Sequence, residues 1–174
     1  SLTTALSKIR SFPDLPKPGV IFRDITPLLG DGEAFHTVIE AMVEKLQAAN
    51  IQADIIVCPE ARGFIFGAAL ANRLKLGFVP IRKPGKLPGE KIEISYDLEY
   101  GQDTLQMHSD AIKPGQKVLV IDDVLATGGT MAACKTLLEK QNASVVAYVF
   151  LMTLKDLGGA QKLEPTPIIS LQEY

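Results

Sequence analysis

The sequence has few of the residues that build metal centres or disulfide frameworks. Of its 174 residues, only two are cysteines and two are histidines. Cys58 and Cys134 stand alone among apolar neighbours, so we expect buried, inert thiols. His36 and His108 have no metal-ligand spacing around them, so we expect ordinary surface or half-buried side chains.

Strong net charge and long apolar runs are missing as well. The formal net charge is −2, which argues against a globally basic nucleic-acid-binding protein. No apolar run is long enough to span a bilayer, and no charged-then-apolar signal peptide opens the chain. We therefore expect a cytoplasmic protein without nucleic-acid or membrane partners. Hydrophobic residues make up 47% and charged residues 22%, which suits a single globular domain over residues 1–174.

Three segments have the hydrophobic period of an amphipathic helix. After Asp31, a candidate N-cap, apolar side chains recur at three- and four-residue steps for about 17 residues, up to Asn50. A second helix is predicted after Arg62, running towards Lys75, and a third after Gly129.

Four short, unbroken apolar runs predict strands that are covered on both faces. They occupy residues 55–57, 78–81, 118–121 and 145–149. Because they alternate with the helical segments, we predict an α/β fold with an open, mainly parallel twisted sheet flanked by helices.

One segment departs from this pattern. Between Ile92 and Met107, apolar and polar residues alternate on both sides of a turn at Tyr100-Gly101, which predicts a protruding antiparallel β-hairpin. A stretch rich in glycine and proline precedes it, at residues 83–89. We expect a mobile flap over about residues 82–108, because a long stretch attached to a compact sheet is usually functional.

The strongest chemical signal is the segment VLVIDDVLATGGT at residues 118–130. An apolar strand is followed by a loop that opens directly into a helix. Paired glycines let backbone N–H groups approach a ligand, and a helix N-terminus adds partial positive charge. Two threonine hydroxyls add further donors. The segment predicts a phosphate monoester site, formed by Ala126, Thr127, Gly128, Gly129 and Thr130.

Two adjacent carboxylates, Asp122 and Asp123, precede this loop. Such a pair either holds Mg²⁺ or accepts hydrogen bonds from vicinal hydroxyls such as those of ribose. A phosphate and a diol bound by one short segment suit a ribose 5-phosphate. The spacing does not fit a Walker A loop, because no lysine follows the glycines.

A second loop on the same rim of the predicted sheet carries Arg62, between a strand end and a helix. Its planar guanidinium suits phosphate oxygens. Arg82, Lys83 and Lys86 follow later among two Pro-Gly steps, which are typical of the hinges and turns of a flap.

The segment VIDDVLATGGT resembles the signature of type I phosphoribosyltransferases, which bind phosphoribosyl pyrophosphate (PRPP). The resemblance implies an open parallel sheet with a separate hood. It also implies that residues 126–130 bind the 5-phosphate and that Asp122 and Asp123 face the ribose hydroxyls. The signature alone does not name the nucleobase.

Residues 59–64 and 81–89 resemble the pyrophosphate loop and flap base of the adenine phosphoribosyltransferases within this family. The resemblance implies pyrophosphate binding and a cis peptide bond before Ala61, where the family usually has serine. Pro84 stands where relatives often have another basic residue. The residues implied to bind pyrophosphate are Glu60, Ala61, Arg62, Arg82, Lys83 and Lys86.

Residues 12–14 and 18–29 resemble the N-terminal hood of the same enzymes, here about residues 1–30. In that hood, backbone groups at the positions of Ile21 and Arg23 read the adenine edge. The segment SYDLEYG resembles the family's catalytic loop, which implies that Glu99 faces the purine and that Tyr100 helps to close the site.

The resemblance as a whole implies transfer of the 5-phosphoribosyl group of PRPP to N9 of adenine, giving AMP and pyrophosphate. It implies Arg62, Glu99 and Tyr100 as catalytic residues, and Mg²⁺ held mainly by PRPP or pyrophosphate rather than by direct protein ligands. It also implies a homodimer. The alternatives are a phosphoribosyltransferase for a 6-oxopurine or orotate, and a PRPP-sensing regulator that binds nucleic acid without catalysis.

Overall fold

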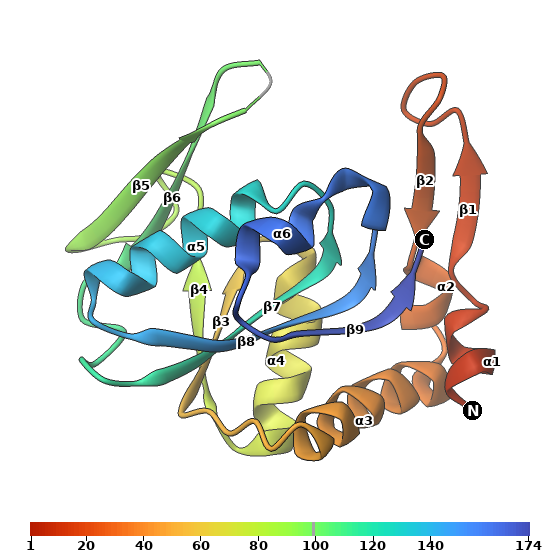
Figure 1. Cartoon of the computed structure of the whole chain (residues 1–174), viewed down its shortest axis with the longest axis horizontal. Coiled ribbons are helices and arrows are strands. Elements are labelled where there is room, and N and C mark those ends of the chain that lie inside the picture. The colour runs from red at the N-terminus through yellow and green to blue at the C-terminus, as the bar shows by residue number, and fades with distance from the viewer. Residues whose placement is uncertain (99) are drawn as a thin grey trace.

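The centre of the molecule is a five-stranded sheet in which all neighbouring strands are parallel (Figure 1). The computed structural model describes residues 1–98 and 100–174. From edge to edge the strands are β4 (Gly77–Ile81), β3 (Ile55–Pro59), β7 (Lys117–Leu125), β8 (Ser144–Thr153) and β9 (Ile168–Glu173). The predicted parallel α/β sheet is confirmed.

The core divides into two layers because successive residues of a strand point to opposite faces. Leu119 and Val149 belong to the cluster beneath α3 (Gly32–Ala48) and α4 (Arg62–Leu74). Val120 and Tyr148 belong to the cluster beneath α5 (Gly129–Lys140). Burial of both faces explains why the strands read as continuous apolar runs.

The three predicted helices are confirmed. Asp31 caps α3, and its side chain accepts a hydrogen bond from the Ala34 N–H. Lys75 ends α4 in the left-handed conformation. The shorter helices were not predicted, since each has too few residues for a hydrophobic period: α1 (Leu2–Leu6), α2 (Thr26–Leu29), the 3₁₀ helix η1 (Lys155–Leu157) and α6 (Gly159–Leu163).

The sequence prediction also missed the edge strand β9. Its residues Ile168–Glu173 are only partly buried, because β9 has a neighbour, β8, on one side only. The segment therefore lacks the unbroken apolar run of a central strand.

Two antiparallel hairpins project from the same side of the molecule (Figure 1). The predicted flap is the hairpin of β5 (Lys91–Asp97) and β6 (Gln102–His108). The hood contains a hairpin of β1 (Arg10–Pro13) and β2 (Ile21–Asp24). The loop that joins β7 to α5 lies between the two hairpins in this view. Among the helices of residues 1–98 and 100–174, none combines the length and the apolar character needed to cross a membrane.

Candidate active site

The predicted phosphate loop joins the carboxyl end of β7 to the first turn of α5. Gly128 occupies the N-cap of α5 with φ +86°, a left-handed conformation that favours glycine. Asp122 and residues 124–131 line a small pocket of about 90 Å³. The N-terminal N–H groups and dipole of α5 therefore adjoin a concave surface, as anion binding requires.

Gly159, at the start of α6, lies directly against this loop. A Cβ atom on Gly128 would come within 2.8 Å of the Gly159 carbonyl oxygen. A Cβ atom on Gly159 would overlap the carbonyl oxygen of Ala126 and lie 3.1 Å from the Gly128 nitrogen. The shape of the phosphate loop thus depends on a glycine that the sequence analysis missed, although the pair Gly158-Gly159 was a visible signal.

The acidic pair lies within β7 rather than after it. Asp123 is 4% exposed, and Asp122 is partly buried. Oδ1 of Asp122 accepts a hydrogen bond of 2.8 Å from the Asp123 N–H. Burial raises the pKa of the Asp122 carboxyl well above its ordinary value, and the neighbouring charge of Asp123 raises it further.

Arg62 contacts this acidic pair from the neighbouring loop. Its Nε atom lies 2.8 Å from Oδ2 of Asp123, while just over half of the Arg62 side chain is exposed. Gly63 allows the approach, because a Cβ atom there would lie 3.1 Å from Oδ1 of Asp122. The two loops therefore meet at one rim of the sheet, as the sequence predicted. The peptide bond between Glu60 and Ala61 is cis, which confirms that expectation.

Glu60 connects this loop to the base of the flap. Its Oε1 atom accepts hydrogen bonds from Arg82 Nε at 2.9 Å and from the Lys83 N–H at 2.8 Å. Burial raises the pKa of Glu60, but these two bonds and the charge of Arg82 act against it, and the pKa is lowered overall. The charge of Lys86 also lowers this pKa, while the Lys86 side chain is exposed. Glu60 thus gathers the cationic residues Arg82, Lys83 and Lys86 of the flap base around one carboxylate. Arg62 pairs instead with Asp123.

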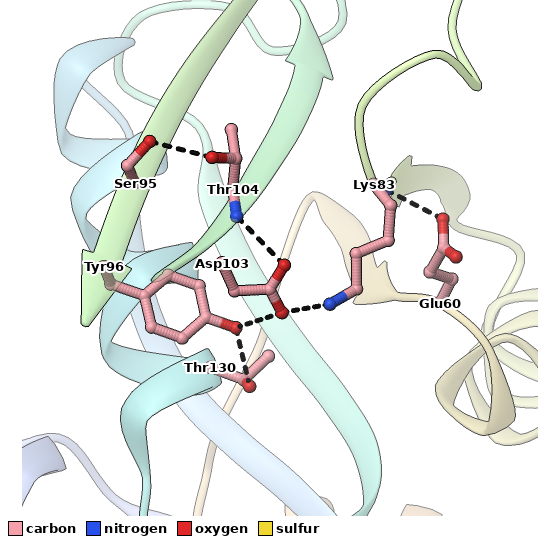
Figure 2. Close-up of polar contacts among 7 residues, drawn as sticks. All are labelled: Glu60, Lys83, Ser95, Tyr96, Asp103, Thr104 and Thr130. Carbon is pink, nitrogen blue, oxygen red and sulfur yellow. Dashed lines mark hydrogen bonds and ion pairs between the residues drawn. The ribbon is translucent and has the colours of Figure 1, made fainter. Parts of the chain in front are cut away.

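The flap is tied to both loops by a chain of polar contacts (Figure 2). The Lys83 ammonium group donates to Oδ2 of Asp103. The Tyr96 hydroxyl lies 3.3 Å from the same oxygen and 3.2 Å from the Thr130 hydroxyl of the phosphate loop. Sequence reasoning assigned no role to Asp103 or Tyr96, because their partners come from three separate segments.

The predicted adenine-reading residues lie on the hood hairpin. Across the described residues β2 pairs with β1 alone, so the second edge of β2 presents backbone groups without sheet partners. Ile21 is 49% exposed. The Arg23 guanidinium donates to the Ser11 hydroxyl at 2.6 Å and lies 3.9 Å from the centre of the Tyr174 ring. These contacts orient β2 and leave its free edge open.

The two remaining predicted residues are Glu99 and Tyr100. Glu99 falls outside the described residues, so its predicted role is not tested. Tyr100 is 86% exposed. Within residues 1–98 and 100–174, no hydrogen bond or ion pair joins Tyr100, Ile21 or Arg23 to the loops around Asp123.

Replacing Asp122 with asparagine should stabilise the ligand-free fold above about pH 4. The folded-state pKa of Asp122 is raised, so the folded protein holds this proton longer than the unfolded chain does. Its contribution to stability is therefore lost as pH rises from the ordinary pKa through the raised one. We expect Asp122→Asn to gain about 1 kcal/mol at pH 7, a typical single-residue effect.

Urea unfolding of both proteins from pH 4 to pH 8 measures this gain. The difference between variant and wild type should grow with pH, because the unfolded chain loses the Asp122 proton before the folded protein does, and carboxylates remote from Asp122 cancel in the comparison. A difference that stays constant or shrinks would contradict the buried, proton-retaining carboxyl.

Known proteins share both the sequence and the fold of this chain. Residues 28–168 match the profile of the phosphoribosyl transferase domain family. An adenine phosphoribosyltransferase from Symbiobacterium thermophilum is 55% identical over 168 residues, which covers 97% of this chain and 98% of the relative. Another, from Trichodesmium erythraeum, is 52% identical over 95% of this chain and 96% of its own.

Solved structures agree with these sequence matches. The crystal structure of adenine phosphoribosyltransferase from Thermoanaerobacter pseudethanolicus has a TM-score of 0.95 and 48% identity, with both chains covered completely. The Saccharomyces cerevisiae enzyme, crystallised with adenine and an imino-altritol bisphosphate, has a TM-score of 0.91 and 37% identity over 97% of this chain and 99% of that one. The phosphate loop, the acidic pair and the arginine loop therefore stand in a fold shared along the whole chain, and the chain belongs to the phosphoribosyltransferase family and, within it, to the adenine phosphoribosyltransferases.

Proposed function

We propose that this chain transfers the 5-phosphoribosyl group of PRPP to N9 of adenine and releases AMP and pyrophosphate. The observation that carries the proposal is the 2.8 Å contact between Arg62 and Asp123. It joins the loop proposed for pyrophosphate to the segment proposed for the ribose and 5-phosphate. A donor with phosphate groups at both ends of its sugar matches a site with anion-binding loops on both sides of an acidic pair.

The phosphate loop would hold the donor through its 5-phosphate. The N–H groups of residues 126–130 and the hydroxyls of Thr127 and Thr130 supply the donors. Asp122 and Asp123 would accept hydrogen bonds from the ribose hydroxyls. This anchoring keeps the anomeric carbon in one place while the bond to pyrophosphate breaks.

Stabilising the leaving group is mainly electrostatic work. The bond to pyrophosphate breaks through a transition state with oxocarbenium character, as in glycoside transfer, so negative charge builds on the departing oxygen. Arg62, Arg82, Lys83 and Lys86 would stabilise that charge, while Glu60 holds two of them in place. Backbone groups at Glu60 and Ala61 would supply further contacts.

The hood and the flap tip would act on the base. Backbone groups at Ile21 and Arg23 would read the adenine edge, a role supported by the unpaired edge of β2. Glu99 would handle the purine proton at N7, and Tyr100 would help to close the site. Flap closure would exclude water, which otherwise hydrolyses the sugar cation.

Mg²⁺ is the proposed cofactor, carried by the donor. Within the described residues no group of three histidine, cysteine or acidic side chains gathers in a way that could hold a metal ion. Asp123 faces Arg62, and Asp122 has a raised pKa, so neither is poised as a strong protein ligand. The ion would neutralise pyrophosphate charge when bound, and the chain would supply the surrounding cations.

The assay that tests the function measures PRPP-dependent turnover of adenine, hypoxanthine, guanine and orotate. We expect adenine to have the highest kcat/KM. A higher kcat/KM for another base would show that this base, and not adenine, is the preferred substrate. Salt-sensitive nucleic-acid binding without consumption of any base would favour the regulator.

The remaining proposals concern the cellular location and the oligomeric state of the protein. We expect a cytoplasmic homodimer, as the family resemblance implies. Light scattering should give a mass near twice the 18.8 kDa of one chain, and the mass of one chain would contradict the dimer.

A further inference from the structure

Asp103 occupies the middle of the polar chain on the flap. It lies on β6 directly opposite Tyr96 of β5 in the hairpin register. Its Oδ2 atom accepts a hydrogen bond from the Lys83 ammonium group and lies 3.3 Å from the Tyr96 hydroxyl (Figure 2). One carboxylate oxygen therefore accepts hydrogen bonds from a cation outside the hairpin and from a hydroxyl within it.

The partners of Asp103 are held at their other ends. The Tyr96 hydroxyl lies 3.2 Å from the Thr130 hydroxyl in the phosphate loop. The backbone of Lys83 is fixed by its 2.8 Å bond to Glu60 in the pyrophosphate loop. Lys83 thus has a fixed backbone, while its side chain reaches towards the flap carboxylate.

The ion pair between Lys83 and Asp103 is weak enough for an anionic ligand to replace Asp103 as the partner of Lys83. The Lys83 side chain is 42% exposed and that of Asp103 is 22% exposed. Their hydrogen bond lowers the pKa of Asp103 and raises the pKa of Lys83, so both stay charged at neutral pH. A partly exposed ion pair contributes little net stability, about 0.2–1 kcal/mol. A ligand with several negative oxygens therefore competes with Asp103 for the ammonium group.

We propose that Asp103 is a positioning residue that holds Lys83 as an internal counter-ion, which pyrophosphate must displace in order to bind. The inference rests on the proposed function, in which Lys83 contacts pyrophosphate. Asp103 keeps the cation oriented at the base of the flap when the site is empty. By competing for Lys83, Asp103 also lowers the affinity of the site for pyrophosphate, which favours release of this product.

Calorimetric titration with pyrophosphate in the presence of Mg²⁺ tests the inference on the complete chain. Four proteins form a cycle: wild type, Asp103→Asn, Lys83→Gln and the double variant. Asp103→Asn keeps an oxygen acceptor for Tyr96 but removes the counter-ion of Lys83. We expect it to bind pyrophosphate about three- to fivefold more tightly, the upper part of the range that a partly exposed ion pair allows.

The double variant separates competition from general charge. With Lys83→Gln present, Asp103→Asn should no longer tighten binding, because the cation for which Asp103 competes is gone. The matched control is Asp110→Asn, an exposed aspartate in the turn after β6, which removes the same charge from a residue that forms no ion pair with Lys83 within the described residues. It should bind pyrophosphate as the wild type does. Damage to the fold would weaken binding, so a gain in affinity is specific to the proposed role.

Two results would overturn the inference in different ways. If Lys83→Gln weakens binding but Asp103→Asn leaves it unchanged or weaker, the counter-ion role of Asp103 is wrong and the proposed function stands. If Lys83→Gln binds pyrophosphate like the wild type, Lys83 does not contact this ligand, and that part of the proposed function fails as well.

Discussion

Arg62→Ala should lower kcat/KM for PRPP by about 10²–10³-fold, the size expected when one preorganised donor to a developing charge is lost. Arg62 stands at the N-terminus of α4, where its guanidinium and the helix dipole would both stabilise the charge of the proposed leaving group. The fold should survive, because 54% of the Arg62 side chain is exposed. Some loss of thermal stability is expected, since Asp123 is nearly buried and loses its partner. Steady-state kinetics well below the melting temperature measure the catalytic effect.

Arg73 provides a matched control for this experiment. It lies in the last turn of the same helix and pairs with Glu40 through a contact of 2.6 Å, with 46% of its side chain exposed. Arg73→Ala should leave kcat/KM within about twofold, because an exposed ion pair distant from the reaction carries little energy. Equal kinetics for Arg62→Ala and Arg73→Ala would remove Arg62 from the catalytic group.

Gly159→Ala should weaken AMP binding by about 10- to 10²-fold, because a lost hydrogen bond to a charged group costs about 1.5–3 kcal/mol. A Cβ atom at residue 159 would overlap the Ala126 carbonyl oxygen and lie 2.9 Å from Cδ1 of Leu125. The Ala126 oxygen belongs to the backbone and cannot rotate away, so the phosphate loop itself must shift. The N–H groups that would face the 5-phosphate then lose their geometry. Calorimetric titration with AMP measures the loss.

Gly32→Ala is the control for this substitution. Gly32 is the first residue of α3, and a Cβ atom there would meet nothing within 4 Å. The added methyl group should therefore leave AMP affinity unchanged. Wild-type AMP affinity in Gly159→Ala would show that α6 does not determine the shape of the phosphate loop.

Secondary structure was predictable wherever a single segment has a clear hydrophobic period or an unbroken apolar run. The periodic apolar residues after Asp31 predicted α3, and the apolar run at residues 118–121 predicted β7. β9 escaped prediction because an edge strand is partly exposed. The helix α6 escaped because five residues are too few for a hydrophobic period.

The phosphate loop, the acidic pair and Arg62 were predictable for a similar reason. Each stands where a strand passes into a helix, and parallel strands bring such junctions to one edge of the sheet. Asp103 was not predictable, because its partners Lys83 and Tyr96 come from separate segments, and Tyr96 in turn contacts Thr130 of a third segment. Its role follows only from distances across the flap.

The motifs of the sequence resemble those of the family, and by itself the sequence determined the parallel α/β fold and the residue types at the phosphate and pyrophosphate loops. These depend on local properties: hydrophobic period, glycine conformation and the chemistry of side chains at strand ends. Only the tertiary structure decided that Gly159 supports the phosphate loop, that Arg62 faces Asp123 and that Asp103 holds Lys83. The physical reason is that close packing and charge pairing act between atoms that are near in space, and nearness in space is set by the whole fold rather than by spacing along the chain.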